Sequence, residues 1–260
     1  MSGDELRTTF EQVPELYDRI RPAYPAELLD DLVTLARIPP GGRVLELGPG
    51  TGQATLPLAE RGFSITAVEL GPRLAAIARR NLERFPNVEI VEADFEVWEP
   101  EQTGYDAVVA FTAFHWVAPE LRYAKPARLL QPGGALAVVE TEHVRDDDPF
   151  WLDVEEDYDA VVPDPANAPS PLPDEVGDLR AELEANGFVD VEVRRYLRSV
   201  TYTAGEYRAL LESYSPNIAR ASDTTRRLLD RVQARVVARP GGRITKPYLF
   251  VLNVGRVARG

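Results

Sequence analysis

The segment 44–52 has the composition of a loop that can hold a nucleotide-like ligand. Its glycines are Gly48, Gly50 and Gly52, and they follow an apolar run that predicts a short strand. Glycine lets the backbone turn tightly and approach a ligand, and the N-terminus of a following helix offers N–H groups that can bind it. A glycine loop alone is not specific, because dinucleotide sites use a related pattern.

Two carboxylates at the ends of later strands make the pattern more specific. Glu69 ends the predicted strand 64–69, where an acidic residue can accept hydrogen bonds from both hydroxyls of a ribose. Asp94 follows the strand 88–93, where a carboxylate can accept from an adenine amino group while the neighbouring Phe95 lies near the base. Taken singly, Glu46, Glu69 and Asp94 could each be a solvated residue at a strand end. Taken together and in order, they favour a binding site.

These residues belong to a regular alternation of strands and helices. Apolar runs predict strands at 44–47, 64–69, 88–93, 105–111 and 135–141. Apolar stripes at helical spacing and stop signals predict helices at 11–20, 25–36, 51–61, 72–85 and 119–130. Strands that alternate with helices are typical of a parallel, doubly wound sheet with both faces covered.

The alternation ends after residue 142. Residues 145–175 are acidic and rich in proline, which favours a solvated connecting loop over a mobile lid. Further on, the pattern predicts helices at 174–186, 204–214 and 223–238 and long strands at 188–201 and 244–257. We therefore expect an α/β fold with a doubly wound, Rossmann-like, mostly parallel seven-stranded sheet, an antiparallel last strand and a helical cap. The division is an N-terminal helical cap (1–40), a ligand-binding core (41–142) and the rest of the sheet with a helical cover (143–260), in one domain overall.

Composition excludes several classes of function. The 260 residues carry a formal net charge of −13, which disfavours non-specific binding to nucleic acid and a basic membrane-binding patch. The chain has no cysteine and only two histidines, His115 and His143, which excludes disulfides and thiolate metal sites and makes a histidine-rich metal site improbable. The only lysines are Lys125 and Lys246. We expect no metal, no membrane span and a cytoplasmic, bacterial protein, with the oligomeric state open.

In ordered combination, several segments resemble the class I S-adenosylmethionine-dependent methyltransferases. The matching segments are 46–52 (ELGPGTG), 68–70 (VEL), 93–95 (ADF), 105–110 (YDAVVA) and 129–136 (LLQPGGAL). The segments 17–25 (YDRIRPAYP) and 111–117 (FTAFHWV) are similar to a subgroup that includes trans-aconitate methyltransferases. The resemblance covers residues 10–141 well and the remainder in outline.

This resemblance implies a cofactor, S-adenosylmethionine, and a set of residues that bind it. Gly48, Gly50 and Gly52 would line its methionine part, Glu69 the ribose, Asp94 with Phe95 the adenine, and Phe111 would lie beside the sulfonium. Tyr17 and Arg21 would approach its carboxylate, which suits a guanidinium. Glu46 and Leu70, which flank these positions in the matching segments, complete the predicted cofactor-binding set.

The methyl acceptor is less well specified by the sequence. Transfer from a sulfonium needs alignment and desolvation, and only a hydroxyl acceptor needs a base. His115 is the candidate catalytic base, although it could instead pack with Trp116 as a pocket wall. Candidate acceptor-binding residues are Trp116, His143, Trp151 and Tyr214, with Phe150, Tyr158 and Tyr202 as further aromatic candidates. Arg194, Arg195 and Arg198 could hold an anionic acceptor, but a solvated strand face is the favoured interpretation.

The sequence thus predicts a methyltransferase that transfers a methyl group to a small-molecule acceptor, with a carboxylate or hydroxyl oxygen favoured and no nucleic acid as partner. Two alternatives stay open. The first is a catalytically silent protein that binds S-adenosylmethionine, because fold and pocket do not prove turnover. The second is an NAD-dependent oxidoreductase, which the alternate spacing of the glycines disfavours.

Overall fold

The computed structural model describes residues 22–163, 169–214, 217 and 222–259. Internal contacts divide the chain into two compact units. The sheet unit comprises Ala23–Thr141, Gly177–Tyr196 and Phe250–Gly260, and the helical unit comprises Met1–Pro22, Glu142–Val176 and Leu197–Leu249. The predicted helix 11–20 lies outside the described residues, as do Tyr17 and Arg21.

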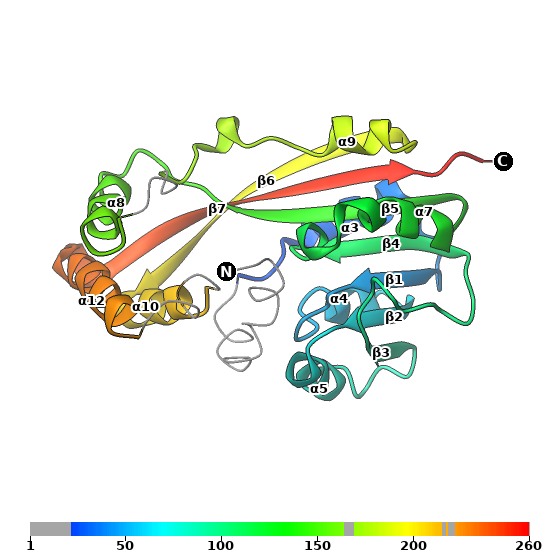
Figure 1. The fold of residues 1–260 in the computed structure, drawn as a ribbon, viewed down its shortest axis with the longest axis horizontal. Coiled ribbons are helices and arrows are strands. Elements are labelled where there is room, and N and C mark those ends of the chain that lie inside the picture. Colours follow the sequence, from blue (N-terminus) through cyan, green and yellow to red (C-terminus); the bar gives the residue numbers. More distant parts are fainter. Residues whose placement is uncertain (1–21, 164–168, 215–216, 218–221, 260) are drawn as a thin grey trace. The chain divides into compact units, whose positions relative to one another are not determined.

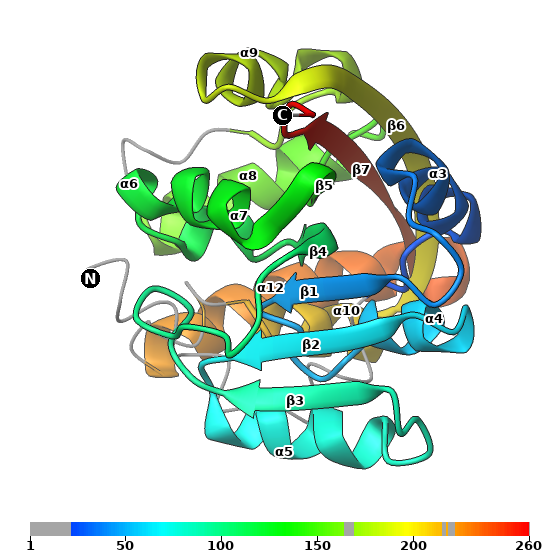
Figure 2. The ribbon, with the colours of Figure 1, turned by 90° about the vertical axis from the view of Figure 1, so that its right-hand side faces the viewer.

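A seven-stranded sheet runs through the described residues in the order β3-β2-β1-β4-β5-β7-β6 (Figures 1 and 2). Its strands are β1 (Arg43–Leu47), β2 (Ser64–Glu69), β3 (Val88–Glu92), β4 (Tyr105–Phe111), β5 (Leu130–His143), β6 (Val189–Thr203) and β7 (Arg243–Arg256). The pairs β1–β2, β1–β4, β2–β3 and β4–β5 are parallel. Strand β7 runs antiparallel to the others, so the predicted doubly wound sheet with an antiparallel last strand is confirmed.

Burial explains why the central strands have continuous apolar sequences. Nearly every residue of β1 and β4 is buried, because neighbours lie on both edges and helices cover the sheet. The edge strand β3 is only partly buried. The parallel strands all end at the same edge of the sheet, which is where open α/β sheets bind ligands.

Six helices of the sheet unit accompany these strands. They are α3 (Ala26–Ala36), α4 (Thr55–Glu60), α5 (Pro72–Asn81), α6 (Pro119–Arg122), α7 (Ala124–Leu129) and α9 (Arg180–Ala185). Helix α5 packs against β2 and β3, and α7 packs against β4. Pro72 stands in the first turn of α5, where its fixed φ favours helix initiation.

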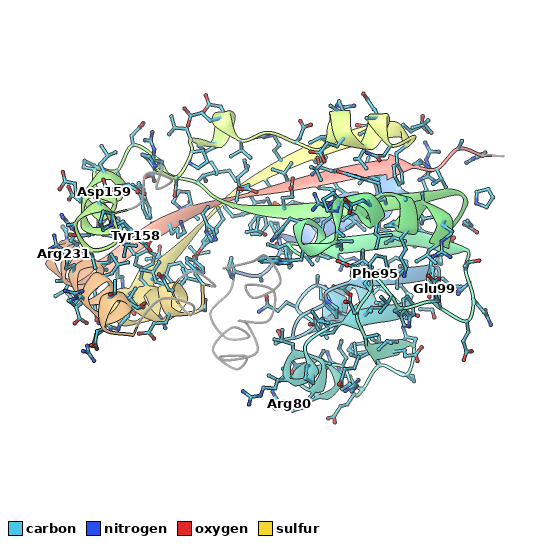
Figure 3. The ribbon with its side chains drawn as sticks, viewed as in Figure 1. Arg80, Phe95, Glu99, Tyr158, Asp159 and Arg231 are labelled. Carbon is cyan, nitrogen blue, oxygen red and sulfur yellow. The ribbon has the colours of Figure 1, made fainter. Side chains whose placement is uncertain are left out.

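The helical unit contains α8 (Phe150–Val161), α10 (Ala204–Glu212) and α12 (Ser222–Ala238), with short 3₁₀ turns at Pro173–Glu175 and Pro240–Gly242. Helix α12 packs against both α8 and α10. In Figure 3, Tyr158 and Asp159 mark α8 and Arg231 marks α12. A capping box begins α10, since the Thr203 hydroxyl accepts from the Glu206 N–H and the Glu206 carboxylate accepts from the Thr203 N–H.

Helix α8 shows that the prediction of a connecting loop was wrong for residues 150–161. Phe150, Trp151 and Val154 are buried at helical spacing, while the acidic Asp153 is exposed. Asp157 also points inward, because it is paired with Arg231 and Arg235 of α12. The acidic residues of this segment therefore lie mostly on the exposed face of a helix, and Asp157 is a buried partner of two arginines. The composition of the segment alone does not reveal either role.

Several predicted helices are shorter or broken in the structure. The predicted helix 119–130 consists of α6 and α7, because Pro126 has no N–H to bond the carbonyl four residues earlier. The predicted helix 174–186 is limited to α9, preceded by the 3₁₀ turn Pro173–Glu175. Helix α4 begins at Thr55 rather than at residue 51, because the positive φ of Gly52 prevents helix there. Strand β5 is longer than predicted, and its ladder with β4 shifts register across residues 131–134.

In the residues that the structure describes, no helix is both long and apolar enough to cross a bilayer. The same residues contain no group of three or more His, Cys, Asp or Glu side chains that could hold a metal ion.

Candidate functional site

The glycine loop joins β1 to α4 and cannot accommodate larger residues. Gly48, Gly50 and Gly52 have φ values of +61°, +60° and +89°, which L side chains rarely adopt. A Cβ on Gly48 would lie 2.7 Å from the Cβ of Ala113, and one on Gly52 would lie 2.9 Å from Leu82 Cδ1. The N–H groups of Gly48 and Gly52 donate to the carbonyls of Val68 and Pro49, so the loop is held by its own backbone and no side chain at the three glycines obstructs a ligand.

Glu69 fixes the loop from the end of β2. Its side chain is 6% exposed, and its carboxylate accepts hydrogen bonds from the Gly50 N–H (2.9 Å) and the Gly71 N–H (2.8 Å). A carboxylate has about four lone-pair sites, so it can accept further bonds from ligand hydroxyls in addition to these two. Leu70 follows directly and is partly buried.

Three buried polar atoms beside the loop have no hydrogen-bond partner among the described residues. They are Glu46 Oε2, Thr51 Oγ1 and Thr55 Oγ1. Glu46 is 1% exposed, and burial raises its pKa to about 7; the nearby Thr55 hydroxyl opposes this shift and the charge of Glu69 adds to it. Because an unsatisfied buried polar atom is costly, this cluster points to a polar ligand group.

The loop after β3 carries Asp94 and Phe95, and the buried Lys125 attaches it to α7. Phe95 and Glu99 of this region are labelled in Figure 3. Asp94 Oδ1 accepts from the Glu96 N–H (3.0 Å), and Phe95 is buried. Lys125 Nζ donates to the carbonyls of Glu96 and Trp98 and lies 5.1 Å from the centre of the Phe95 ring. Lys125 thus holds in place the loop that presents both predicted adenine-binding residues.

At the end of β4, Phe111 is followed by a strained residue. Thr112 has a φ of +56°, which is rare for a β-branched side chain. Its hydroxyl lies 2.9 Å from the Thr141 hydroxyl and 3.3 Å from that of Tyr24, whose ring packs 4.8 Å from Phe111. Phe111 is buried and Thr112 is only partly so, which leaves an apolar ring beside a line of three hydroxyls at the carboxyl end of the sheet.

His115 and Trp116 form a pair in a 3₁₀ turn just beyond, with ring centres 4.6 Å apart. The surrounding protein lowers the pKa of His115 by desolvation, and the charge of Arg122 lowers it further, which favours the neutral imidazole. Within the described part of the chain, no hydrogen bond orients this ring. The arrangement can supply a base, but it lacks the third group that usually orients one.

The other three predicted acceptor-binding residues lie in the helical unit, and the structure brings them into one aromatic cluster. The ring of His143 lies 4.8 Å from Tyr214 and 5.6 Å from Tyr248. Tyr248 and Trp151 both lie against Lys246. The structure shows that Arg194, Arg195 and Arg198 are exposed. This agrees with the interpretation that they lie on a solvated strand face.

Sequence reasoning missed Lys125, Lys246 and Thr112 as residues of interest. Nothing in the sequence marks the positive φ of Thr112. The two lysines were recognisable in the sequence by their rarity, because every other basic residue besides the histidines is arginine. The structure shows that both lysines are buried.

Comparisons with known proteins agree with this geometry. Residues 44–134 match the protein family described as "Methyltransferase domain". An uncharacterised methyltransferase of Mycobacterium bovis is 34% identical over 151 residues, which are 58% of this chain and 58% of that protein. The chain thus spans little more than half the length of this curated relative.

Two solved structures share the fold. A putative type II methyltransferase from Anaeromyxobacter dehalogenans has a TM-score of 0.65 and 22% identity, and the match covers 92% of this chain and 99% of that one. A phosphoethanolamine N-methyltransferase of Haemonchus contortus, in complex with phosphomonomethylethanolamine and S-adenosylhomocysteine, has a TM-score of 0.55 and 17% identity. That match covers 95% of this chain and 57% of the other.

Proposed function

We propose that this chain, whose residues 44–134 match the methyltransferase-domain family, is an S-adenosylmethionine-dependent methyltransferase acting on a small molecule. The observation that carries the proposal is the glycine loop after β1, fixed by the buried Glu69 and bordered by partnerless polar atoms of Glu46, Thr51 and Thr55. These residues fit an amino-acid and nucleoside ligand, because a loop without side chains at its glycines lies beside buried oxygen atoms that can bond polar ligand groups.

The residues that would hold the cofactor lie at the ends of three consecutive parallel strands. The loop glycines would accept its methionine part, Glu69 its ribose hydroxyls, and Asp94 with Phe95 its adenine. Glu46 and Leu70 would border the same site. Tyr17 and Arg21, which lie outside the described residues, would approach its carboxylate, as the family resemblance implies.

S-adenosylmethionine, when bound, supplies an electrophilic methyl group on a sulfonium. The protein has to align the acceptor with that group and exclude water. Phe111 supplies a buried apolar ring at the end of β4, and Tyr24 packs against it. The strained backbone of Thr112 turns the chain at this position, and its hydrogen bonds to Thr141 and Tyr24 hold that turn.

We favour a carboxylate or hydroxyl oxygen as the acceptor atom. A carboxylate needs no base. For a hydroxyl acceptor, His115 is the candidate base, because its lowered pKa keeps the imidazole neutral and able to accept a proton. Replacing it in H115A should then lower kcat about 100-fold without changing cofactor affinity. Unchanged turnover of a hydroxyl acceptor by H115A would make His115 a pocket wall beside Trp116.

The second candidate function is a catalytically silent protein that binds the same cofactor. The observation that favours it is the His115 imidazole, which no hydrogen bond orients within the described residues. Turnover of any acceptor in the presence of S-adenosylmethionine would exclude this alternative.

Calorimetric titration with S-adenosylmethionine, S-adenosylhomocysteine and NAD tests the proposal. We expect the two sulfur compounds to bind and NAD not to bind. E69A should weaken binding by roughly 1–3 kcal/mol, the cost of losing a buried hydrogen-bonding partner. E92A is the matched control, because Glu92 is the register partner of Glu69 on β3 but is exposed and paired with Arg79.

Binding of NAD alone would overturn the proposal in favour of an oxidoreductase. Equal affinities in E69A and E92A would overturn the placement of the ribose. Because Glu69 also holds the loop, the unfolding free energy of both variants has to be measured in parallel, so that loss of binding is not confused with loss of folding.

A further inference from the structure

The buried face of β7 carries a lysine where an apolar side chain is expected. At the start of the strand, Arg243 and Thr245 are exposed, whereas Ile244, Lys246 and Tyr248 are buried. Lys246 is 4% exposed, and Tyr248 is fully buried. The ammonium group is therefore part of the interior of the helical unit.

Among the described residues, the direct contacts of this ammonium group are with aromatic rings. Lys246 Nζ lies 5.1 Å from the centre of the Trp151 ring and 5.2 Å from that of Tyr248. It makes no hydrogen bond or ion pair with any residue that the structure describes. The carboxylate of Asp146 acts on it only from a greater distance and instead accepts a hydrogen bond from Trp151 Nε1 (2.6 Å). Burial lowers the pKa of Lys246 to about 8, so the group is still mainly charged at neutral pH.

Two aspartates of the helical unit are paired with arginines. Asp157 is almost inaccessible and is bonded by Arg231 at 2.7 Å and by Arg235. Asp148, which is less buried, is bonded by Arg239. A buried ion without an opposite charge costs several kcal/mol, of which contacts with two rings return only part. Lys246 has no such direct ion pair with a described residue, and a bound anion would supply one.

The groups around Lys246 indicate what kind of anion would fit. Trp151 and Tyr248 present aromatic rings to the ammonium, and the Tyr248 hydroxyl is engaged with that of Tyr202 (3.0 Å). His143 and Tyr214 extend the aromatic cluster beyond Tyr248. A single cation matches a single negative charge, and flat rings match a flat apolar body.

We propose that Lys246 is the anchor of a binding site for a small aromatic carboxylate, with the acid group on Nζ and the ring packed beside Trp151 and Tyr248. The site takes a monoanion, because the residues that the structure describes supply one ammonium and no second cation in contact with it. The proposal concerns binding within the helical unit and holds whether or not the bound acid accepts a methyl group.

The scarcity of lysine makes the test direct. Protein labelled with ¹³C at lysine Cε gives two side-chain signals, and Lys125 serves as the internal control because its ammonium is already bonded to oxygens. The probes are 2-naphthoate and its neutral analogue 2-naphthamide. We expect 2-naphthoate to shift the Lys246 signal saturably and to leave the Lys125 signal in place, while 2-naphthamide shifts neither.

Two variants test whether Lys246 is the residue that binds 2-naphthoate. K246M should weaken 2-naphthoate binding, measured by calorimetry, by about tenfold or more, the loss expected for one buried charged partner. R243M is the matched control, because it removes an exposed positive charge from the same strand and should bind normally. Absence of a saturable shift up to the solubility limit of the probe, or equal binding to K246M and R243M, would overturn the proposal.

The result is separable from the proposed function. S-adenosylhomocysteine titrated into the same K246M sample reports on the glycine loop and not on Lys246. Loss of 2-naphthoate binding with S-adenosylhomocysteine affinity intact supports the carboxylate site. Failure of the wild-type protein to bind S-adenosylhomocysteine would remove the methyltransferase proposal and leave the carboxylate site standing.

Discussion

The two lysines of this chain occupy equally buried positions in different units and have opposite surroundings. Lys125 in the sheet unit is 3% exposed and is bonded to the carbonyls of Glu96 and Trp98, with the Glu99 carboxylate 3.4 Å away. Lys246 in the helical unit is 4% exposed and has two aromatic rings as its neighbours. The same ammonium group is therefore bonded to oxygens in one unit and, among the described residues, has no oxygen partner in the other.

The difference separates two roles for a buried charge. The partners of Lys125 belong to the chain itself, so its bonds stabilise the folded state and position the loop that carries Asp94 and Phe95. Lys246 lacks such partners, so its burial costs stability that only a bound group can return. Glu46 resembles Lys246 in this respect, since it is also buried and its Oε2 has no hydrogen bond among the described residues. Both lie where we propose ligands.

The largest effect is expected from removing the bonded lysine. K125M leaves two buried carbonyls without their donor, and we expect the free energy of unfolding to fall by roughly 3 kcal/mol. Affinity for S-adenosylhomocysteine should also fall, because the loop with Asp94 and Phe95 loses its attachment to α7. Urea denaturation and calorimetry measure the two effects. A free energy of unfolding equal to that of wild type would contradict a structural role for Lys125.

The same substitution in the other unit should have the opposite sign. K246M replaces an unpaired buried ion by an apolar side chain, and we expect the free energy of unfolding at pH 7 to rise by about 1 kcal/mol. Thermal denaturation without added ligand measures the change. If K246M is destabilised as strongly as K125M, Lys246 has a structural role and the contrast between the two lysines disappears.

The third prediction is a pH dependence that arises from Lys246. Its pKa is about 8 in the folded protein and about 10.4 in an unfolded chain, so between these values the unfolded state holds more protons. The free energy of unfolding contributed by this group therefore rises with pH over that window. The advantage of K246M over wild type should shrink between pH 8 and about pH 10. A constant difference over that range would show that Lys246 does not titrate there.

Strand positions and the mostly parallel sheet with an antiparallel last strand were predictable from the sequence. Strands β2 and β4 have the bounds that their apolar runs predict, because they are buried on both faces and bounded by polar or glycine-containing turns. The helix α8 was not predicted, because its exposed face and its inward Asp157 are both acidic and the segment resembles a loop in composition. Only the arginines of α12, more than 70 residues later, show that Asp157 is buried and paired.

For the candidate sites, the sequence by itself determined the glycine loop and the carboxylates at the strand ends. Local conformational rules and strand order place such residues at one edge of a parallel sheet. Only the tertiary structure decided which charges have partners: Glu69 is bonded to the loop and Lys125 to carbonyls, whereas Glu46 Oε2 and Lys246 Nζ have no hydrogen bond among the described residues. Whether a buried charge is paired depends on residues that are distant in the chain, and the cost of burial depends on that pairing.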